Sequence, residues 1–312
     1  LENMRVIFAG TPLNAAATLI ALKKSGIDIV AVLTRTDAPM GRKKVLTQSP
    51  VADAAQALGI PVVKANQVDE HALSQLESFK AELGVVVAYG AFLNETALQF
   101  LPKGWINLHY SLLPALRGAA PVQHALLQGF RETGVTAFEL DKGMDTGPIL
   151  LQAATVIEPD ENAGRLLNRL TQIGITVLLE LLPSIAAGIA NPIPQNESGA
   201  NFAPKINRTH AQIDWNRSAI SIQQQVLAMN PEPMAWTTIG DDSFRILDSR
   251  IYLGENFPST PGTVQMVDGK VLVTCHNDSL QLISVQPAGK NEMPAGDWFR
   301  GAQNKENLVF GS

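Results

Sequence analysis

The segment from Trp105 to Pro114 most constrains how this chain can fold. It has the pattern of a β-strand that ends in a loop, because Pro114 cannot donate a ladder hydrogen bond. Side chains on a strand alternate faces, which puts three polar residues on one face and three apolar residues on the other: Asn107, His109 and Ser111 against Ile106, Leu108 and Tyr110. A polar row on a buried strand costs desolvation energy unless something uses it. Because ligands of open α/β sheets bind where strands run out into loops, the segment predicts a ligand site.

The runs around this segment predict a Rossmann-like α/β domain with a parallel sheet. Arg5 to Ala9 is apolar and ends at Gly10, and a helical stretch over 13–25 leads to a second apolar run over 27–34, which is a βαβ opening. Further strands are expected over 85–90, 106–111, 135–140 and 149–156, with helices over 49–58 and 70–81. Apolar residues at helical spacing predict a long helix over 162–187 that closes the domain against the sheet.

The chain changes character near residue 190, where Gly, Pro, Asn and Ser become frequent. A short helix is expected over 218–229, and five short strand-like runs follow it. The Asp-Gly pair in Val267–Lys270 is a strong hairpin signal. The patterns predict a first domain over 4–189, a linker over 190–207 and a small OB-like β-barrel over 208–312.

Composition excludes several classes of protein. The net charge of −5 gives no general signal for binding polyanions. Cys275 is the single cysteine, which excludes an internal disulfide framework and is typical of a reducing compartment such as the cytoplasm. No run of about 18 uncharged apolar residues indicates a membrane span. The histidines other than His109 have no His or Cys partner at ligand spacing, so no metal site is expected.

The first predicted strand ends in Gly10-Thr11-Pro12, which lacks the second and third glycines of a dinucleotide-binding turn. Proline also removes a backbone N–H that a phosphate would use. The chain therefore has the Rossmann-type order of elements without the signature of NAD binding. Neither a G-x-S-x-G elbow nor a Cys/His nucleophile pair is present, so we expect the nucleophile to come from a substrate.

Asn107, His109 and Asp145 form the candidate catalytic set. A lone histidine is more often structural than catalytic, but His109 shares a strand face with Asn107 just before a predicted ligand loop. Asn107 can donate hydrogen bonds to a developing oxyanion without changing charge. A neighbouring carboxylate would orient His109 and raise its pKa. Within residues 141–147, Asp145 is a better candidate for that carboxylate than Asp141, which suits a turn, and Gly147 would allow a ligand to approach the backbone closely.

The chain resembles the methionyl-tRNA formyltransferase family, from Met4 to about Gly301. The resemblance rests on FAGTP after the first strand, NLHYSLLPALRGAAPVQHALL, ETGV, GMDTG, IDW and PGTV. The H-x-SLLP and DTG pair is shared by the wider group of 10-formyltetrahydrofolate transferases. The RGAAPVQ segment and the predicted C-terminal barrel restrict the resemblance to the methionyl-tRNA formyltransferases within that group. The resemblance implies transfer of a formyl group from 10-formyltetrahydrofolate to the α-amino group of methionyl-initiator tRNA.

The resemblance also implies residue roles in three groups: Asn107, His109 and Asp145 are catalytic, Ser111, Leu112, Leu113 and Pro114 contact the folate, and Arg42, Lys43 and Lys44 contact the tRNA. The chain departs from the family after FAGTP, where Leu13-Asn14-Ala15-Ala16 replaces the usual Asp-Phe and nearby proline. It also departs in charge, because residues 208–312 carry 8 Lys and Arg against 11 Asp and Glu, whereas a tRNA-binding domain is expected to be basic.

The chemistry of amine formylation agrees with this set. An amine that attacks a formyl carbon produces a tetrahedral oxyanion, which Asn107 and a protonated His109 would stabilise while Asp145 holds the charge of His109. No metal is required. Three alternatives stay open: formylation of a nucleotide-sugar amine, hydrolysis of formyl-folate, and a folate- or nucleic-acid-binding module without catalysis. The presence of Asn107, His109 and Asp145 together argues against the non-catalytic module.

We expect the protein to be a monomer in the cytoplasm.

Overall fold

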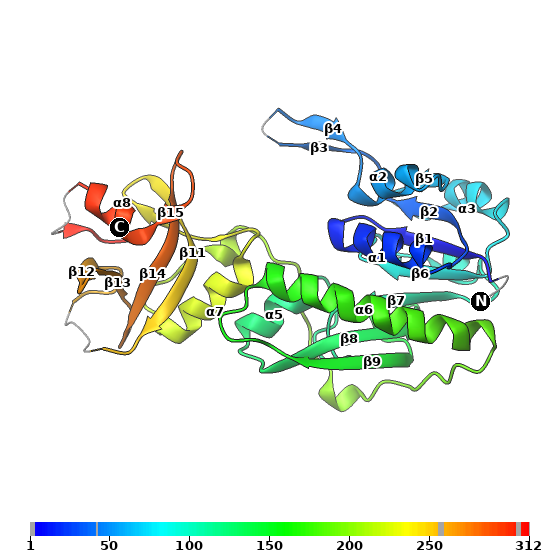
Figure 1. Cartoon of the computed structure of the whole chain (residues 1–312). Coiled ribbons are helices and arrows are strands. Elements are labelled where there is room, and N and C mark those ends of the chain that lie inside the picture. Colours follow the sequence, from blue (N-terminus) through cyan, green and yellow to red (C-terminus); the bar gives the residue numbers. More distant parts are fainter. Residues whose placement is uncertain (1–3, 42, 255–258, 304–306, 312) are drawn as a thin grey trace. The chain divides into compact units, whose positions relative to one another are not determined.

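The computed structural model describes residues 4–41, 43–254, 259–303 and 307–311. The chain divides into two compact units, and each is described by itself (Figure 1). The first unit takes in the chain up to Gly118, with Glu132–Thr155 and Leu167–Ala203. The second comprises Ala119–Arg131, Val156–Leu166 and the chain from Pro204 onward.

A seven-stranded sheet forms the centre of the first unit. Its strands are β1 (Val6–Gly10), β2 (Ile29–Thr34), β5 (Val62–Lys64), β6 (Leu83–Val87), β7 (Trp105–His109), β8 (Glu132–Glu139) and β9 (Ile149–Val156). They lie in the order β5-β2-β1-β6-β7-β8-β9. The five strands from β5 to β7 pair in parallel, and β8 pairs antiparallel with β7. The predicted Rossmann-like fold with a mostly parallel sheet is confirmed.

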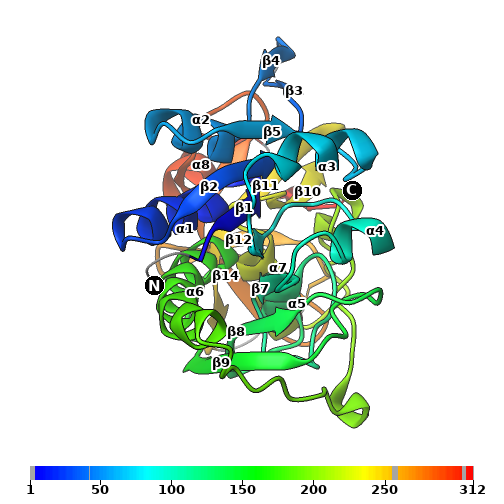
Figure 2. The same ribbon diagram turned by 90° about the vertical axis from the view of Figure 1, so that its right-hand side faces the viewer.

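Helices cover both faces of this sheet. They are α1 (Leu13–Lys24), α2 (Pro50–Ala57), α3 (Glu70–Glu77), α4 (Glu95–Leu98) and α6 (Ala163–Ala186). Figure 2 shows α1 and α6 on one face and α3 and α4 on the other. Leu108 of β7 lies against Gly174 of α6, where a Cβ would come within 2.5 Å of the Leu108 side chain. On the opposite face the Trp105 indole donates to the Ala97 carbonyl of α4, so the two faces predicted for this strand are observed.

Polar side chains at the N-caps begin three of these helices. Ser49 accepts a hydrogen bond from the Ala52 amide at α2, and Asp69 accepts one from the Ala72 amide at α3. Asn94 caps α4 in the same way. Each side-chain oxygen satisfies an amide that has no partner inside its helix, which is worth about 1 kcal/mol.

Among the described residues, α6 is the one helix that is long and apolar enough to cross a membrane. It matches the long helix predicted over 162–187. Leu166, Leu170, Leu178 and Leu182 are fully buried and recur at helical spacing. This is the pattern of a helix with one face in a protein core. Such a core helix can be as long and as apolar as a membrane-crossing helix.

The segment between β2 and α2 forms a two-stranded hairpin, β3 (Ala38–Met40) and β4 (Val45–Thr47), that projects from the sheet of its unit (Figures 1 and 2). No strand is identified here from the sequence. All six strand residues are exposed, so the hairpin lacks the apolar alternation that marks a strand in a sequence. Lys43 and Lys44 lie exposed at its turn, whereas Arg42 lies outside the described residues.

The second unit contains an antiparallel sheet and several helices. The sheet elements are β10 (Ala235–Ile239), β11 (Asp242–Tyr252), β12 (Val264–Val267), β13 (Lys270–Thr274), β14 (Ser279–Pro287) and β15 (Met293–Pro294), and the helices are α5 (Pro121–Leu127), α7 (Ala219–Met229) and α8 (Ala295–Gly301). The strands lie in the order β10-β11-β14-β13-β12, with β15 beside β14. Asp268 and Gly269 both have positive φ between the paired Val267 and Lys270, as the predicted hairpin requires.

The OB-like barrel stays a prediction with which this sheet is compatible. Backbone hydrogen bonds of the C-terminal segment reach both ends of the sheet: Gly311 donates to Thr238 of β10, and Phe310 donates to Gly262 just before β12. The domain boundaries at 189 and 208 also stay a proposal. The contacts add that α5 packs against α7, although α5 precedes both boundaries in the sequence.

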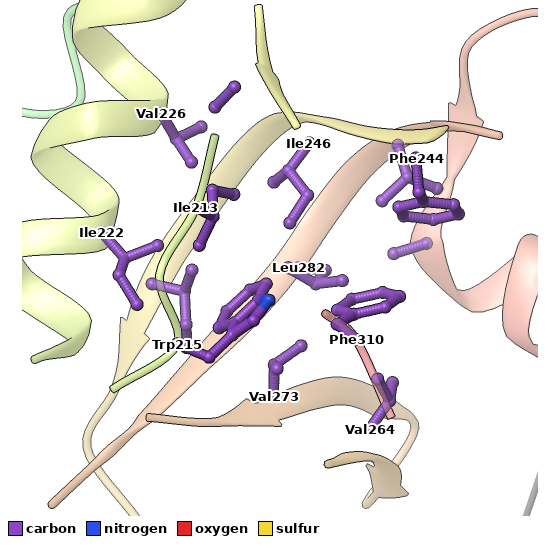
Figure 3. Packing of buried hydrophobic residues seen from close by; sticks show 14 of the residues in the cluster. Ile213, Trp215, Ile222, Val226, Phe244, Ile246, Val264, Val273, Leu282 and Phe310 are labelled. Carbon is purple, nitrogen blue, oxygen red and sulfur yellow. The ribbon is translucent and has the colours of Figure 1, made fainter. Parts of the chain in front are cut away.

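Aromatic rings fill the core of the second unit (Figure 3). The Phe310 ring stacks on Trp215 at 5.5 Å between centroids and on Trp298 at 5.8 Å, and it lies 5.0 Å from Phe244. Phe310 is 2% exposed, so its ring packs on all sides.

We expect Phe310→Ala to lower the free energy of unfolding by about 3–5 kcal/mol, because it leaves a cavity among these rings. Chemical denaturation followed by tryptophan fluorescence measures the loss. Leu253→Ala is the matched control, since that side chain is 93% exposed. An equal loss in both variants would contradict the assignment of Phe310 to the core.

Candidate active site

Asn107 and His109 lie on the same face of β7 at the end of the strand. His109 is buried, with the edge of its ring toward Phe138 at 6.4 Å between centroids. Asn107 is half-buried and pairs with Phe138 in the antiparallel register of β7 and β8. The Asn107 carboxamide makes no hydrogen bond to any other described residue. Its donors are therefore available to a ligand.

Both ring nitrogens of His109 face hydrogen-bond acceptors. Nε2 lies 2.8 Å from the Leu116 carbonyl oxygen, and Nδ1 lies 3.7 Å from Oδ2 of Asp145. A carbonyl oxygen only accepts, so Nε2 carries the hydrogen in this contact. In the neutral imidazole the lone pair is then on Nδ1, the nitrogen that faces the carboxylate.

Burial lowers the pKa of His109 below its ordinary value of 6.5 and is the largest influence on it. The Asp145 carboxylate and the bond to the Leu116 carbonyl raise this pKa without overcoming the loss of solvation. The Asp145 carboxylate therefore raises the pKa of His109 as predicted, whereas burial, which the sequence does not report, sets the net direction. His109 is a buried imidazole held beside a carboxylate.

The loop that carries Asp145 is fixed by backbone contacts. Asp145 has a φ of +55°, in the left-handed region, and its Oδ2 accepts a hydrogen bond of 2.8 Å from the Gly118 amide. Asp141 accepts hydrogen bonds from Gly143 and Thr146, which is the turn role predicted for it. Two of the predicted catalytic residues thus meet here, since β7 and this loop bring His109 and Asp145 into contact.

Gly147 also has a packing role within the protein. A Cβ at this position would come within 1.8 Å of the Glu139 carbonyl oxygen of β8. Glycine is therefore required here by the protein's own backbone, and its closeness to a ligand stays a prediction.

The predicted folate loop, Ser111–Pro114, is held from below by β8. Thr136 Oγ1 donates to the Ser111 carbonyl and accepts from the Leu113 amide. Ser111 is 1% exposed and Leu113 is 3% exposed, and the Ser111 hydroxyl donates to the Ala115 carbonyl. Those two side chains build the loop, which leaves the half-buried Leu112 and Pro114 and the backbone to face a ligand.

Sequence reasoning missed a set of residues that hold this site from the predicted linker. The Gln195 side chain donates to the carbonyl oxygens of Asp145 and Gly147, both at 2.8 Å, and accepts from the buried Arg117 guanidinium. Asn201 accepts from the Leu116 amide through Oδ1. No local pattern could have found these residues, because their partners lie roughly 50 to 85 positions away in the chain.

One of the residues that depart from the family pattern after FAGTP, Asn14, contacts the segment that follows β7. Asn14 of α1 donates a hydrogen bond of 2.9 Å to the Tyr110 hydroxyl, on the face of β7 opposite His109. Leu13 is 77% exposed. Burial raises the pKa of Tyr110, so this phenol is a neutral structural group.

A hollow of about 610 Å³ is also present in the first unit. It is lined by Asn66, Gln67, Val68, Asp69, Phe92, Leu93, Asn94, Glu95, Leu98 and Lys142. Lys142 belongs to the Asp145 loop, but none of the three candidate catalytic residues lines the hollow. In the described part of the chain, His, Cys, Asp and Glu form no group of three that could hold a metal ion.

Two protein-family models match the chain. The formyl transferase model covers residues 3–182, and the model for the formyl transferase C-terminal domain covers residues 205–303. The methionyl-tRNA formyltransferase of Clavibacter sepedonicus is 43% identical over 306 residues, which is 98% of this chain and 100% of that protein.

Solved structures of formyltransferases share the fold. The N-formyltransferase from Helicobacter canadensis, solved with folinic acid and dTDP-3-aminofucose, gives a TM-score of 0.67 at 18% identity over 91% of this chain and 100% of that one. The methionyl-tRNA formyltransferase from Clostridium thermocellum gives a TM-score of 0.57 at 14% identity over 81% of this chain and 96% of that one. At such identities the likeness concerns the fold alone.

The contact between His109 and Asp145 predicts a titration that can be measured. Because the carboxylate raises the pKa of His109, Asp145→Asn should lower that pKa further below 6.5. Imidazole ¹⁵N NMR against pH measures it, with His109→Ala to assign the signal. Asp28→Asn, which removes an exposed carboxylate, is the charge-matched control. A pKa that rises or stays unchanged in Asp145→Asn would show that the two groups do not interact.

Proposed function

Since the chain belongs to the methionyl-tRNA formyltransferase family, we propose that Asn107, His109 and Asp145 carry the family's reaction, formyl transfer from 10-formyltetrahydrofolate to the α-amino group of methionyl-initiator tRNA. The single observation that supports this assignment is the contact of His109 with Asp145, beside an Asn107 carboxamide with unused donors. An acid–base pair and an oxyanion donor are the groups that amine formylation needs.

Asn107 acts on the formyl oxygen. When the amine attacks the formyl carbon, the C=O electron pair moves onto oxygen and a tetrahedral oxyanion forms. The Asn107 amide donates to that oxygen without a change in its own charge. A donor aimed at a developing oxyanion lowers the barrier because it needs no reorganisation during the reaction.

His109 takes the proton that the amine loses. The bond from Nε2 to the Leu116 carbonyl keeps the lone pair on Nδ1, and burial keeps the ring neutral until the reaction supplies the proton. The imidazolium that forms has a carboxylate at Nδ1 and a carbonyl at Nε2. His109 then returns the proton to the departing folate nitrogen as the C–N bond breaks. This imidazolium is the protonated His109 that we expected from the sequence to stabilise the oxyanion.

The exposed hairpin is the part of the first unit that we assign to the tRNA. Met40, Val45 and Leu46 are 60%, 59% and 67% exposed on strands β3 and β4. A two-stranded hairpin has little stability of its own, and exposed apolar groups of this kind mark a contact surface. Lys43 and Lys44 at its turn supply positive charge, to which Arg42 adds by resemblance to the family.

The remaining assignments follow from the family. Ser111, Leu112, Leu113 and Pro114 form the folate loop, with Leu112, Pro114 and the backbone as the contacting parts. The C-terminal unit contributes to tRNA binding through local basic groups, since its overall charge is negative. We place the protein in the cytoplasm, away from membranes, as a monomer.

We expect Asn107→Ala, His109→Ala and Asp145→Ala each to reduce kcat by about 10²–10³, the usual effect of removing one such group. Asp145→Asn should cost nearly as much, because it keeps the shape and loses the charge. Single-turnover formylation of methionyl-tRNA measures the rate, and circular dichroism checks the fold. A near-normal rate in any of these variants would refute the role proposed for that residue.

We expect Lys43→Ala with Lys44→Ala to raise the KM for tRNA and to flatten its salt dependence, because each lost phosphate contact removes about 0.9 from the log–log slope. The KM for the folate should not change. Lys24→Ala with Lys80→Ala removes the same charge at exposed positions elsewhere and is the control. If the control variant changed the slope as much as the hairpin variant, the effect would be one of net charge and the hairpin assignment would fail.

A further inference from the structure

We propose that residues 195–203, within the segment predicted as a linker, form a strap that positions both partners of His109, with Gln195 and Asn201 as the positioning residues. The proposal rests on the function proposed above. Gln195 sets the Asp145 backbone, and Asn201 sets the Leu116 backbone. Neither residue contacts His109 among the described hydrogen bonds, so each acts through another residue.

Both ends of the Gln195 carboxamide make hydrogen bonds, and exchanging its oxygen and nitrogen would break them. Its Nε2 donates to the carbonyls of Asp145 and Gly147, and its Oε1 accepts from Nε and Nη2 of Arg117 at 3.1 and 2.7 Å. Arg117 is 3% exposed and also makes a two-pronged contact with Glu197. A buried guanidinium therefore anchors the amide that holds the Asp145 loop in place.

Asn201 holds the other side of His109. Its Oδ1 accepts from the Leu116 amide, its carbonyl accepts from the Arg117 amide at 2.9 Å, and the Ala203 amide donates to the Arg117 carbonyl at 2.7 Å. The strap thus pairs with the loop that presents the Leu116 carbonyl. Gly118 completes the fit, since a Cβ there would lie 2.9 Å from the Ala203 carbonyl oxygen.

The strap bonds to two residues whose backbone is strained. Leu116 and Asp145 have φ angles of +59° and +55°, in the left-handed region that non-glycine residues rarely adopt. Such a conformation is strained and persists only where the surroundings hold it. Both residues that face the ring nitrogens of His109 have this conformation, and the strap bonds to the backbone of both. Without it, the two acceptors would relax away from the geometry that orients the imidazole.

The test uses two substitutions that remove one function of each side chain. Gln195→Glu keeps an acceptor for Arg117 but cannot donate to the carbonyls of Asp145 and Gly147. Asn201→Ala removes the acceptor for Leu116, whereas Asn201→Asp retains it and should rescue. Gln172→Glu makes the same chemical change on an exposed glutamine of α6 and is the matched control.

We expect Gln195→Glu and Asn201→Ala to lower kcat by about 10- to 100-fold, as misplacement of a catalytic group does, with the KM for folate and for tRNA within about threefold of the intact chain. Asn201→Asp and Gln172→Glu should keep kcat within about threefold. Amide hydrogen exchange by NMR is the readout that does not depend on activity. Exchange at Gly118, which donates to Asp145, should accelerate at least about tenfold in Gln195→Glu, and exchange at Leu116 should do so in Asn201→Ala.

Unchanged kcat and unchanged exchange in both variants would overturn the strap, as would a rise in KM with kcat intact. Asn201→Asp as slow as Asn201→Ala would remove Asn201 from it. The assay includes the intact chain and His109→Ala. If these two were equally active or equally inactive, the proposed function would fail, and the exchange measurement would still decide whether the strap holds the two loops.

Discussion

The site depends on the burial of one imidazole between two acceptors. His109 is 5% exposed at the end of β7, where a charged ring would lose most of its solvation. The Leu116 carbonyl at Nε2 and the Asp145 carboxylate at Nδ1 compensate only in part, so the pKa of the ring stays below its ordinary value. The surrounding loops have the conformations that this arrangement demands.

Those conformations explain features that look unrelated along the chain. Leu116 and Asp145 are left-handed, Gly118 must be a glycine to fit beneath Ala203, and Gly147 must be one to fit against Glu139. The two glycines bring backbone into positions that a side chain would prevent, and the other two residues hold a conformation that side chains rarely adopt. Holding the backbone in these conformations costs folding free energy. Buried hydrogen bonds made by Arg117 and the strap offset that cost.

The hairpin β3–β4 follows the opposite logic. Its strands are exposed on both faces and its turn carries lysines, so little inside the first unit determines its position beyond its base. At that base the Thr34 and Ser49 hydroxyls are 2.6 Å apart, and Lys64 pairs with Asp37. The hairpin is thus anchored at one end and exposed at the other, whereas His109 and Asp145 are held by contacts on several sides.

The sequence by itself determined the βαβ opening, the long helix α6, the two faces of β7 and the three catalytic candidates, because periodicity, glycine and proline positions and short motifs are local signals. Only the tertiary structure decided the direction in which the pKa of His109 shifts, the packing of Gly147 and the strap. The carboxylate near His109 suggested a raised pKa, but the balance depends on burial, which no local pattern reports. Gln195 and Asn201 read as linker residues because their partners, Asp145 and Leu116, become neighbours only when distant loops fold together.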